Sequence, residues 1–387
     1  MAVANVEAVA GTEQPAWLDF YHVGPDTLAG RFMRSFWQPI ARAQDVPAGR
    51  AKPIHMLGIE LTVYRGEDGA VHALAFRCAH RGTQLSTGWV EGDNLRCFYH
   101  GWVYGPDGQC VEQPAEPEPF CSRIRIRSYP VREYLGLIFA YLGEGEAPEF
   151  PRFPQFEAEG VLESDPSSEI PCSFFNRIEN SVDEVHIPFV HRHSYYTESL
   201  GSVPQMSAEE TEYGIFRHGS RPGAADRLAH FLMPNILLRT GQPWAQDATA
   251  WRDVIAWRVP IDDTHHTVFG VSLVHVTGEA AERYREERRA ARGPRRSVVE
   301  VGNAILAGEM TVEEAGFNQI NVQDYVAQVG QGPILTPQYD HLGKSDAVIV
   351  LLRGIWAREL RALAEGRPTK AWRYPEHFAL ANGNELG

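Results

Sequence analysis

Two short segments, each holding one cysteine and one histidine, constrain this 387-residue chain more than any other feature of its sequence. The first is Cys78-Ala79-His80, and the second, after 16 intervening residues, is Cys97-Phe98-Tyr99-His100. Together they offer two thiolates and two imidazoles, which are ligands for zinc and for iron. Zinc fingers pair cysteine with cysteine and histidine with histidine, whereas each segment here mixes the two. The mixed order favours a [2Fe–2S] cluster with two cysteines on one iron and two histidines on the other.

Zinc remains the alternative at these segments, and core cysteines and histidines without a ligand role are a third interpretation. Gly82 and Gly101 follow the two histidines. Small residues at these places let backbone N–H groups approach bridging sulfides. Cys110, Cys121 and Cys172 lie outside the two segments, and we expect each to be a small buried apolar residue.

Composition limits the class of protein. Hydrophobic residues make up 43% and charged residues 22%, as in globular proteins. The 36 basic and 50 acidic residues give a net charge of −14, which argues against nucleic acids or anionic membranes as partners. No apolar run reaches the ~18 residues of a membrane span. Residues 1–15 do not resemble a signal peptide, and five cysteines are too few for a disulfide scaffold, so we expect a cytoplasmic protein.

A second group of metal-ligating residues lies beyond a glycine- and proline-rich linker at residues 143–154. At helical spacing, Asn180, Asp183, His186 and His191 can face one cavity. Pro188 opposes a regular helix, and a kinked turn between the two histidines would let both approach one ion. Two imidazoles and a carboxylate form the facial triad of non-haem Fe(II), which leaves positions open for O₂. Alone, such a histidine pair is usually a surface or core feature.

Both groups carry a resemblance to a known family. Cys78-x-His80-Arg81-Gly82 with Cys97-x₂-His100-Gly101-Trp102 resembles a Rieske domain, and Asp183-x₂-His186-x₄-His191 resembles the iron motif of Rieske non-haem iron oxygenases. Respiratory Rieske proteins carry two further cysteines where this chain has Thr83 and Tyr99. The chain is therefore more similar to the oxygenase and ferredoxin type.

The resemblance implies roles for individual residues. Cys78, His80, Cys97 and His100 would bind the [2Fe–2S] cluster, and His186 and His191 the mononuclear iron. Asp183 matches an acid that bridges a ligand histidine to a cluster histidine of the neighbouring subunit in a homotrimer.

The third iron ligand is expected at Asp324, because the segments that follow it resemble the phthalate-dioxygenase-like branch. Asp340 and Asp346 are weaker alternatives for this ligand. His193 does not fit the motif, and the neighbouring His265 and His266 would point to opposite faces of a strand.

The implied fold class is α+β. An N-terminal antiparallel β Rieske domain would occupy residues 31–147 after a leader at 1–30, and a helix-grip (START/Bet v1-like) catalytic domain would occupy 148–387. The residue pattern itself predicts secondary structure. We expect a hairpin of residues 59–64 and 70–76, a buried strand at 135–142, two strands within 251–276, and helices at 279–296 and 345–365.

The implied function is the terminal oxygenase component of a multicomponent system. It would use O₂ to hydroxylate or oxidatively demethylate an aromatic substrate, with electrons from a separate NAD(P)H-dependent flavin and iron–sulfur reductase, possibly through a ferredoxin. The alternative is a Rieske electron-transfer protein without oxygenase activity. Six aromatic residues are candidates for the pocket wall: Phe174, Phe175, Phe189, Phe231, Trp251 and Phe269.

Overall fold

Short strands joined by tight turns build the N-terminal part of the protein. The computed structural model describes residues 15–165, 168–194, 197, 200–223, 226–244, 247–290, 296–317 and 319–378. Within these residues, the N-terminal strands form three antiparallel sheets, ordered β1-β11-β10, β2-β3-β4-β9 and β5-β6-β7-β8. Helix α1 (Leu28–Arg34) precedes the strands β1 (Trp37–Arg42), β2 (Arg50–Met56), β3 (Ile59–Arg65), β4 (Val71–Ala75), β5 (Trp89–Glu91), β6 (Asn94–Arg96), β7 (Val103–Tyr104), β8 (Cys110–Glu112), β9 (Ser128–Tyr129), β10 (Val131–Tyr134) and β11 (Leu137–Tyr141).

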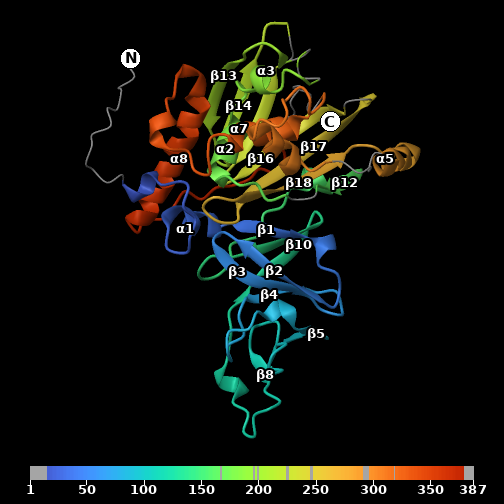
Figure 1. The fold of residues 1–387 in the computed structure, drawn as a ribbon, viewed down its shortest axis with the longest axis vertical. Helices are drawn as coiled ribbons and strands as arrows, with labels where there is room; N and C mark the ends of the chain where they lie inside the picture. The colour runs from blue at the N-terminus through green and yellow to red at the C-terminus, as the bar shows by residue number, and fades with distance from the viewer. Residues whose placement is uncertain are drawn as a thin grey trace.

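The second part is one antiparallel sheet with helices against it. Within the described residues the sheet has seven strands, in the order β12-β18-β17-β16-β15-β14-β13. Its strands are β12 (Val161–Ser164), β13 (Gln205–Glu210), β14 (Gly214–Ser220), β15 (Arg227–Leu232), β16 (Ile236–Trp244), β17 (Asp247–Pro260) and β18 (His266–Val274). The accompanying helices are α2 (Phe174–Val182), α3 (Ile187–Val190), α5 (Gly278–Ala290), α6 (Val298–Leu306), α7 (Ile320–Val329) and α8 (Ala347–Ala364). Figure 1 shows α2 and α7 over one face of this sheet and α8 along its β13 edge.

Helix α2 is amphipathic, and its two faces serve different purposes. Ser173 caps it by accepting a hydrogen bond from the Phe175 N–H. Phe174, Phe175 and Ile178 are fully buried, and both phenylalanine rings pack against Trp356 of α8. The opposite face, with its polar side chains, lines a cavity.

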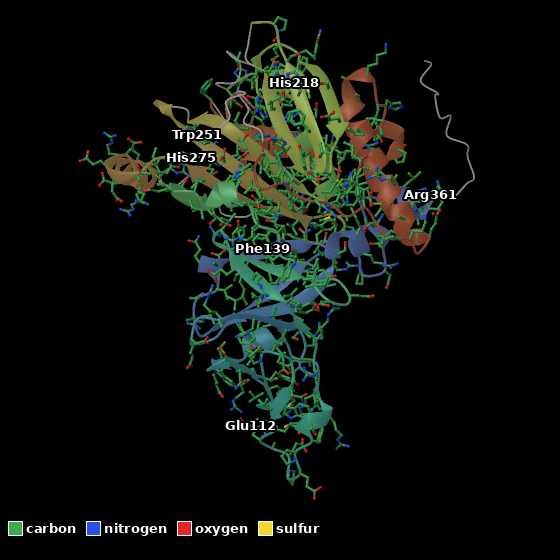
Figure 2. All side chains as sticks on the ribbon, turned by 180° about the vertical axis from the view of Figure 1, so that it is seen from behind. Glu112, Phe139, His218, Trp251, His275 and Arg361 are labelled. Atoms are coloured by element: carbon green, nitrogen blue, oxygen red, sulfur yellow. The ribbon has the colours of Figure 1, made fainter. Side chains whose placement is uncertain are left out.

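The two parts meet over a continuous core. Phe139 of β11 packs edge-on against Trp257 of β17, with ring centroids 5.3 Å apart. The backbone N–H of Leu57 donates to the Pro260 carbonyl at 2.7 Å, which ties the β2–β3 turn to the end of β17. Figure 2 labels Phe139 at this junction and Glu112 toward the far end of the N-terminal part. The junction thus joins the two parts through both packing and backbone hydrogen bonds.

Most of the local predictions are confirmed. The predicted hairpin is β3 and β4, the buried strand is β11, and the two predicted C-terminal strands are β17 and β18. The predicted helices are α5 and α8, although residues 291–295 of the first prediction lie outside the described residues. The α+β class is also confirmed, because antiparallel sheets build both parts and helices pack on the second.

The predicted domain boundaries stay predictions. Residues 1–14 of the predicted leader lie outside the described residues. Its later residues contribute a 3₁₀ turn, Ala16–Leu18, and the start of α1, and both pack against α8. Among the described residues, no helix combines the length and apolar composition needed to cross a bilayer.

Candidate functional site

Two histidines and one aspartate converge beneath the sheet. The Asp324 Oδ1 atom lies 3.3 Å from His191 Nε2 and 3.8 Å from His186 Nε2. The three ligand atoms all lie within 4.8 Å of one another, and no other such group of three occurs among the described residues. The structure therefore brings together the three residues that the sequence proposed as iron ligands.

A break between two helices positions the histidines. Helix α2 ends at Val182, and Asp183 is extended, with φ −79° and ψ 132°. His186 then precedes the short helix α3, in which Pro188 lies in the first turn. Proline is tolerated there because the first-turn N–H groups have no partner within the helix. The expected kink between the two histidines is therefore wrong in position, because the break precedes His186.

Hydrogen bonds at the outer nitrogens orient both imidazoles. His186 Nδ1 donates to Asp183 Oδ2 at 3.1 Å, and His191 Nδ1 donates to Gln323 Oε1 at 2.9 Å. These bonds hold the protons on Nδ1, so the Nε2 lone pairs face Asp324. Sequence reasoning missed Gln323, although its position beside Asp324 could have indicated it.

The Asp324 carboxylate is held from its other side by α2. Arg177 Nη1 donates to Asp324 Oδ2 at 3.2 Å, and Asn180 Nδ2 lies 3.5 Å from Oδ1. Burial alone would raise the pKa of the Asp324 carboxyl, but the contact with His191 and the Arg177 charge outweigh it, and the pKa lies well below its usual value. The carboxylate is therefore anionic, as a metal ligand must be.

This donor set fits a single divalent iron. Two neutral imidazoles and one carboxylate are the facial triad of non-haem iron. Metal–ligand bonds of about 2.1 Å at right angles place neighbouring ligand atoms about 3 Å apart. The distances from Asp324 to the two histidines, 3.3 and 3.8 Å, are close to that value.

The alternative ligands lie elsewhere. Asp340 is ion-paired with Arg353, and Asp346 accepts a hydrogen bond from the Gly343 N–H. His193 faces Glu313 at 3.2 Å. His265 bonds to Asp262, whereas His266 is fully buried and bonds to the Cys172 carbonyl. As predicted, these last two histidines do not form a chelating pair.

The two cysteine–histidine segments form matching loops at the far end of the N-terminal part. The Gly82 N–H donates to the Cys78 carbonyl at 2.9 Å, and the Gly101 N–H donates to the Cys97 carbonyl at 3.1 Å. Both glycines have φ near +75° (+75° and +74°), a conformation that favours glycine. The two loops therefore close by the same turn.

The side chains of these loops fit a binuclear cluster. Cys78 and Cys97 are buried, the His80 and His100 ring centroids lie 4.5 Å apart, and His80 stacks on Trp102. His80 Nδ1 is buried without a hydrogen-bond partner among the described residues, which leaves it free to bind iron. The pairing of two buried thiols with two neighbouring imidazoles is the donor set of a [2Fe–2S] cluster with mixed ligands.

A buried ion-pair cluster fixes the turn between α2 and α3. Glu184 is 1% exposed, and its carboxylate lies 2.8 Å from Arg217 Nη1, 3.2 Å from Arg221 Nη1 and 3.6 Å from Arg227 Nε. Burial would raise the pKa of Glu184, but these guanidinium groups, Arg217 first, lower it to about 2. The neighbouring Asp183 is thereby tied to strand β14.

The iron-site residues line a cavity of about 440 Å³ between the sheet and helices α2, α6 and α7. The sheet supplies alternate residues, including Leu237, Val254 and Val268. None of the six aromatic residues expected in the pocket wall lines it. Phe174 and Phe175 of α2 face the core instead. Trp251 stacks on His275, and Figure 2 labels the two residues side by side.

Comparison with known proteins adds an independent line of evidence. Residues 36–130 match the Rieske [2Fe-2S] domain family. The chain is 29% identical to the 5,5'-dehydrodivanillate O-demethylase oxygenase subunit of Sphingobium sp., over 90% of this chain and 80% of that protein. It is 27% identical to the phthalate 4,5-dioxygenase oxygenase subunit of Pseudomonas putida, over 88% of this chain and 84% of that protein.

Solved structures show the same fold. The QL mutant of Pseudomonas putida CBB5 NdmA with caffeine superimposes with a TM-score of 0.63 at 18% identity, over 86% of this chain and 92% of that chain. The oxygenase in the reduced complex with ferredoxin of carbazole 1,9a-dioxygenase gives a TM-score of 0.62 at 21% identity, over 89% and 94%. At these identities the likeness concerns the fold alone.

Replacing Glu184 by glutamine should destabilise the protein strongly. The substitution leaves the buried guanidinium groups of Arg217 and Arg221 without a carboxylate, which costs about 3–5 kcal/mol of unfolding free energy. Urea denaturation followed by circular dichroism measures this. Glu313→Gln, at an exposed carboxylate, is the control and should unfold like the wild type. Equal stability of Glu184→Gln and wild type would contradict a structural role for this cluster.

Proposed function

The chain belongs to the Rieske non-haem iron oxygenases, and we propose that it oxygenates an aromatic compound at the site formed by His186, His191 and Asp324. One observation carries this proposal. One chain holds both the two cysteine–histidine loops and the iron ligands His186, His191 and Asp324. These three ligands line a cavity large enough for a small organic molecule.

The cofactors are a [2Fe–2S] Rieske cluster and a mononuclear iron. When bound, the cluster supplies single electrons and the iron activates O₂. The protein's own residues prepare the site. Asp183 and Gln323 keep the ligand imidazoles in the tautomer that offers Nε2, and Arg177 keeps Asp324 ionised.

The protein is a terminal oxygenase and not only an electron carrier. An electron-transfer protein needs the cysteine–histidine loops but no second metal site. Here the relatives align over most of the chain, including the half that holds the triad. The alternative of a Rieske protein without oxygenase activity is therefore wrong.

A separate electron-transfer protein supplies this oxygenase. We propose an NAD(P)H-dependent flavin and iron–sulfur reductase as the ultimate source, with or without a ferredoxin. The five cysteines are unpaired, which supports the cytoplasm as the proposed location.

A homotrimer is the proposed assembly. In Figure 1 the strands β5 and β8, which flank the cluster loops, lie at one end of the molecule, and α2 and α7 lie in the other half. The cluster loops and the iron site of one chain are thus separated by the β1–β4 region. A ring would place His100 of one subunit beside Asp183 of the next, as the resemblance implies.

The proposed function is tested by a product screen under ¹⁸O₂. The iron-loaded protein, a surrogate reductase and NADH are incubated with aromatic acids, aromatic hydrocarbons and aryl methyl ethers. We expect either ¹⁸O in a hydroxylated product or loss of a methyl group, detected by mass spectrometry. NADH oxidation without any product across the panel would contradict the proposal.

Replacing His186 by alanine should remove the mononuclear iron and leave the Rieske chromophore intact. The two sites share no ligand, so iron should fall from three to two per chain, with activity lost. Cys97→Ala is the matched variant and should bleach the visible spectrum. The measurements are iron analysis and the absorbance and paramagnetic signals of the reduced protein. Three irons per chain in His186→Ala would remove this residue from the ligand set.

Replacing Asp183 by asparagine should keep both metals and slow turnover by about 10–100-fold, the usual effect of losing a carboxylate that orients a ligand histidine. Stopped-flow reoxidation of the reduced chromophore, with substrate and O₂ present, measures the rate of electron transfer from the cluster to the iron site. Iron content and the visible spectrum should match the wild type. A fully active variant would rule out the bridging role.

A further inference from the structure

A buried arginine in the cavity wall has no acidic partner. Arg258 of β17 is 4% exposed, and within the described residues no carboxylate lies within ion-pair distance of its guanidinium group. Its Nε donates to Ser181 Oγ at 2.9 Å and its Nη1 donates to the Ala256 carbonyl. Its Nη2 has no hydrogen-bond partner among the described residues. The side chain therefore has an unused donor in the cavity wall.

The electrostatic surroundings of Arg258 are positive. Burial first, and then the nearby charges of Arg177 and Arg239, lower its pKa well below the usual value. The one carboxylate that opposes this effect is Asp324, which is already bonded to Arg177 and faces the two iron-site histidines. The acid that acts on Arg258 thus already has another purpose.

The position of Arg258 connects this charge to the iron site. Ser181, to which it donates, is next to Asn180 on α2, and Asn180 contacts Asp324 and His186. Arg258 and Arg239 line the same cavity as the iron-site residues. A small organic molecule in this cavity can therefore contact both these arginines and the iron-site residues.

A buried charge without a partner costs several kcal/mol, and such a charge persists where a ligand supplies the opposite charge. From this, and resting on the proposed function, we propose that Arg258 is the specificity-determining residue that binds a carboxylate of the substrate. The aliphatic side chains of Leu237, Val254 and Val268 on the same sheet face then contact the ring. The preferred substrates are thereby aromatic carboxylates, and neutral arenes of the same size bind more weakly.

Calorimetric titration of the anaerobic, iron-loaded protein tests this independently of turnover. The probes are benzoate, 3-chlorobenzoate and 3-methoxybenzoate, each beside its primary amide as a neutral molecule of the same shape. Charge-assisted hydrogen bonds favour the acids by about tenfold or more in affinity. The inference is overturned if no acid binds at least severalfold more tightly than its amide.

Three variants assign the effect to Arg258. Arg258→Leu should abolish the preference for acid over amide, and Arg258→Lys should retain part of it, because it keeps the charge but loses the planar donor pair. Arg252→Leu is the matched control: Arg252 is on the same strand but outside the cavity lining, and its loss should leave the preference unchanged. An unchanged preference in Arg258→Leu would overturn the assignment.

Thermal unfolding without ligand separates a binding role from a structural one. Because Arg258→Leu removes an uncompensated buried charge, the ligand-free variant should melt at the wild-type temperature or above it. A large drop in melting temperature with the acid preference intact would assign Arg258 to the fold. Acid binding that depends on Arg258, without any oxygenated product, would contradict only the proposed function. Turnover of neutral arenes without any preference for acids would contradict only this inference.

Discussion

The contact between the Asp324 carboxylate and helix α2 is the interaction on which the candidate active site depends. One oxygen of this carboxylate faces His186 and His191, and the other accepts a hydrogen bond from Arg177. Helix α7, which supplies Asp324, is positioned in turn by α6. At Gly302 a side-chain Cβ would lie 2.2 Å from the Tyr325 ring, so the close approach of the two helices requires glycine there. A ligand set spread over 138 residues therefore rests on helix packing and not on the local motif.

Several buried arginines lie on the sheet side of the site, and they differ in whether the protein provides a carboxylate for them. At Glu184, three guanidinium groups surround one carboxylate, and the cluster holds the turn that leads into the iron ligands. At Arg258, the guanidinium group faces the cavity with no carboxylate of its own. In the first arrangement the protein itself supplies the carboxylate, and the cluster fixes geometry. The second is incomplete, which is the property expected of a group that meets its counter-charge in a ligand.

The sequence predicted the parts of the site that local spacing encodes. The cysteine–histidine loops and the His186–His191 pair are short segments, and their turns follow from nearby glycine and proline residues. Hydrogen-bonded partners such as Arg177 and Gln323 were not predictable, because their contacts span 132 to 147 residues of the chain. The prediction that six aromatic residues line the cavity was wrong for a related reason. Whether a strand residue faces the cavity or the core depends on sheet register and on which helices cover that face, and hydrophobicity alone favours aromatic residues that fill the core.

The separation of the two donor sets within one chain has a consequence for assembly. The cluster loops lie at the end of the N-terminal part, with Phe98 and Tyr99 exposed, and the iron-site turn carries Phe189, which is 62% exposed. Exposed aromatic side chains are concentrated where proteins meet other proteins. A contact between one chain's cluster loops and the next chain's α3 is heterologous, because it joins two different surfaces, and such contacts either close into a ring or continue as a filament. Closure into a ring covers each of these surfaces once per subunit and gives every iron site a neighbouring cluster. In the proposed homotrimer, the neighbouring chain would therefore supply the cluster that each chain holds at its own far end.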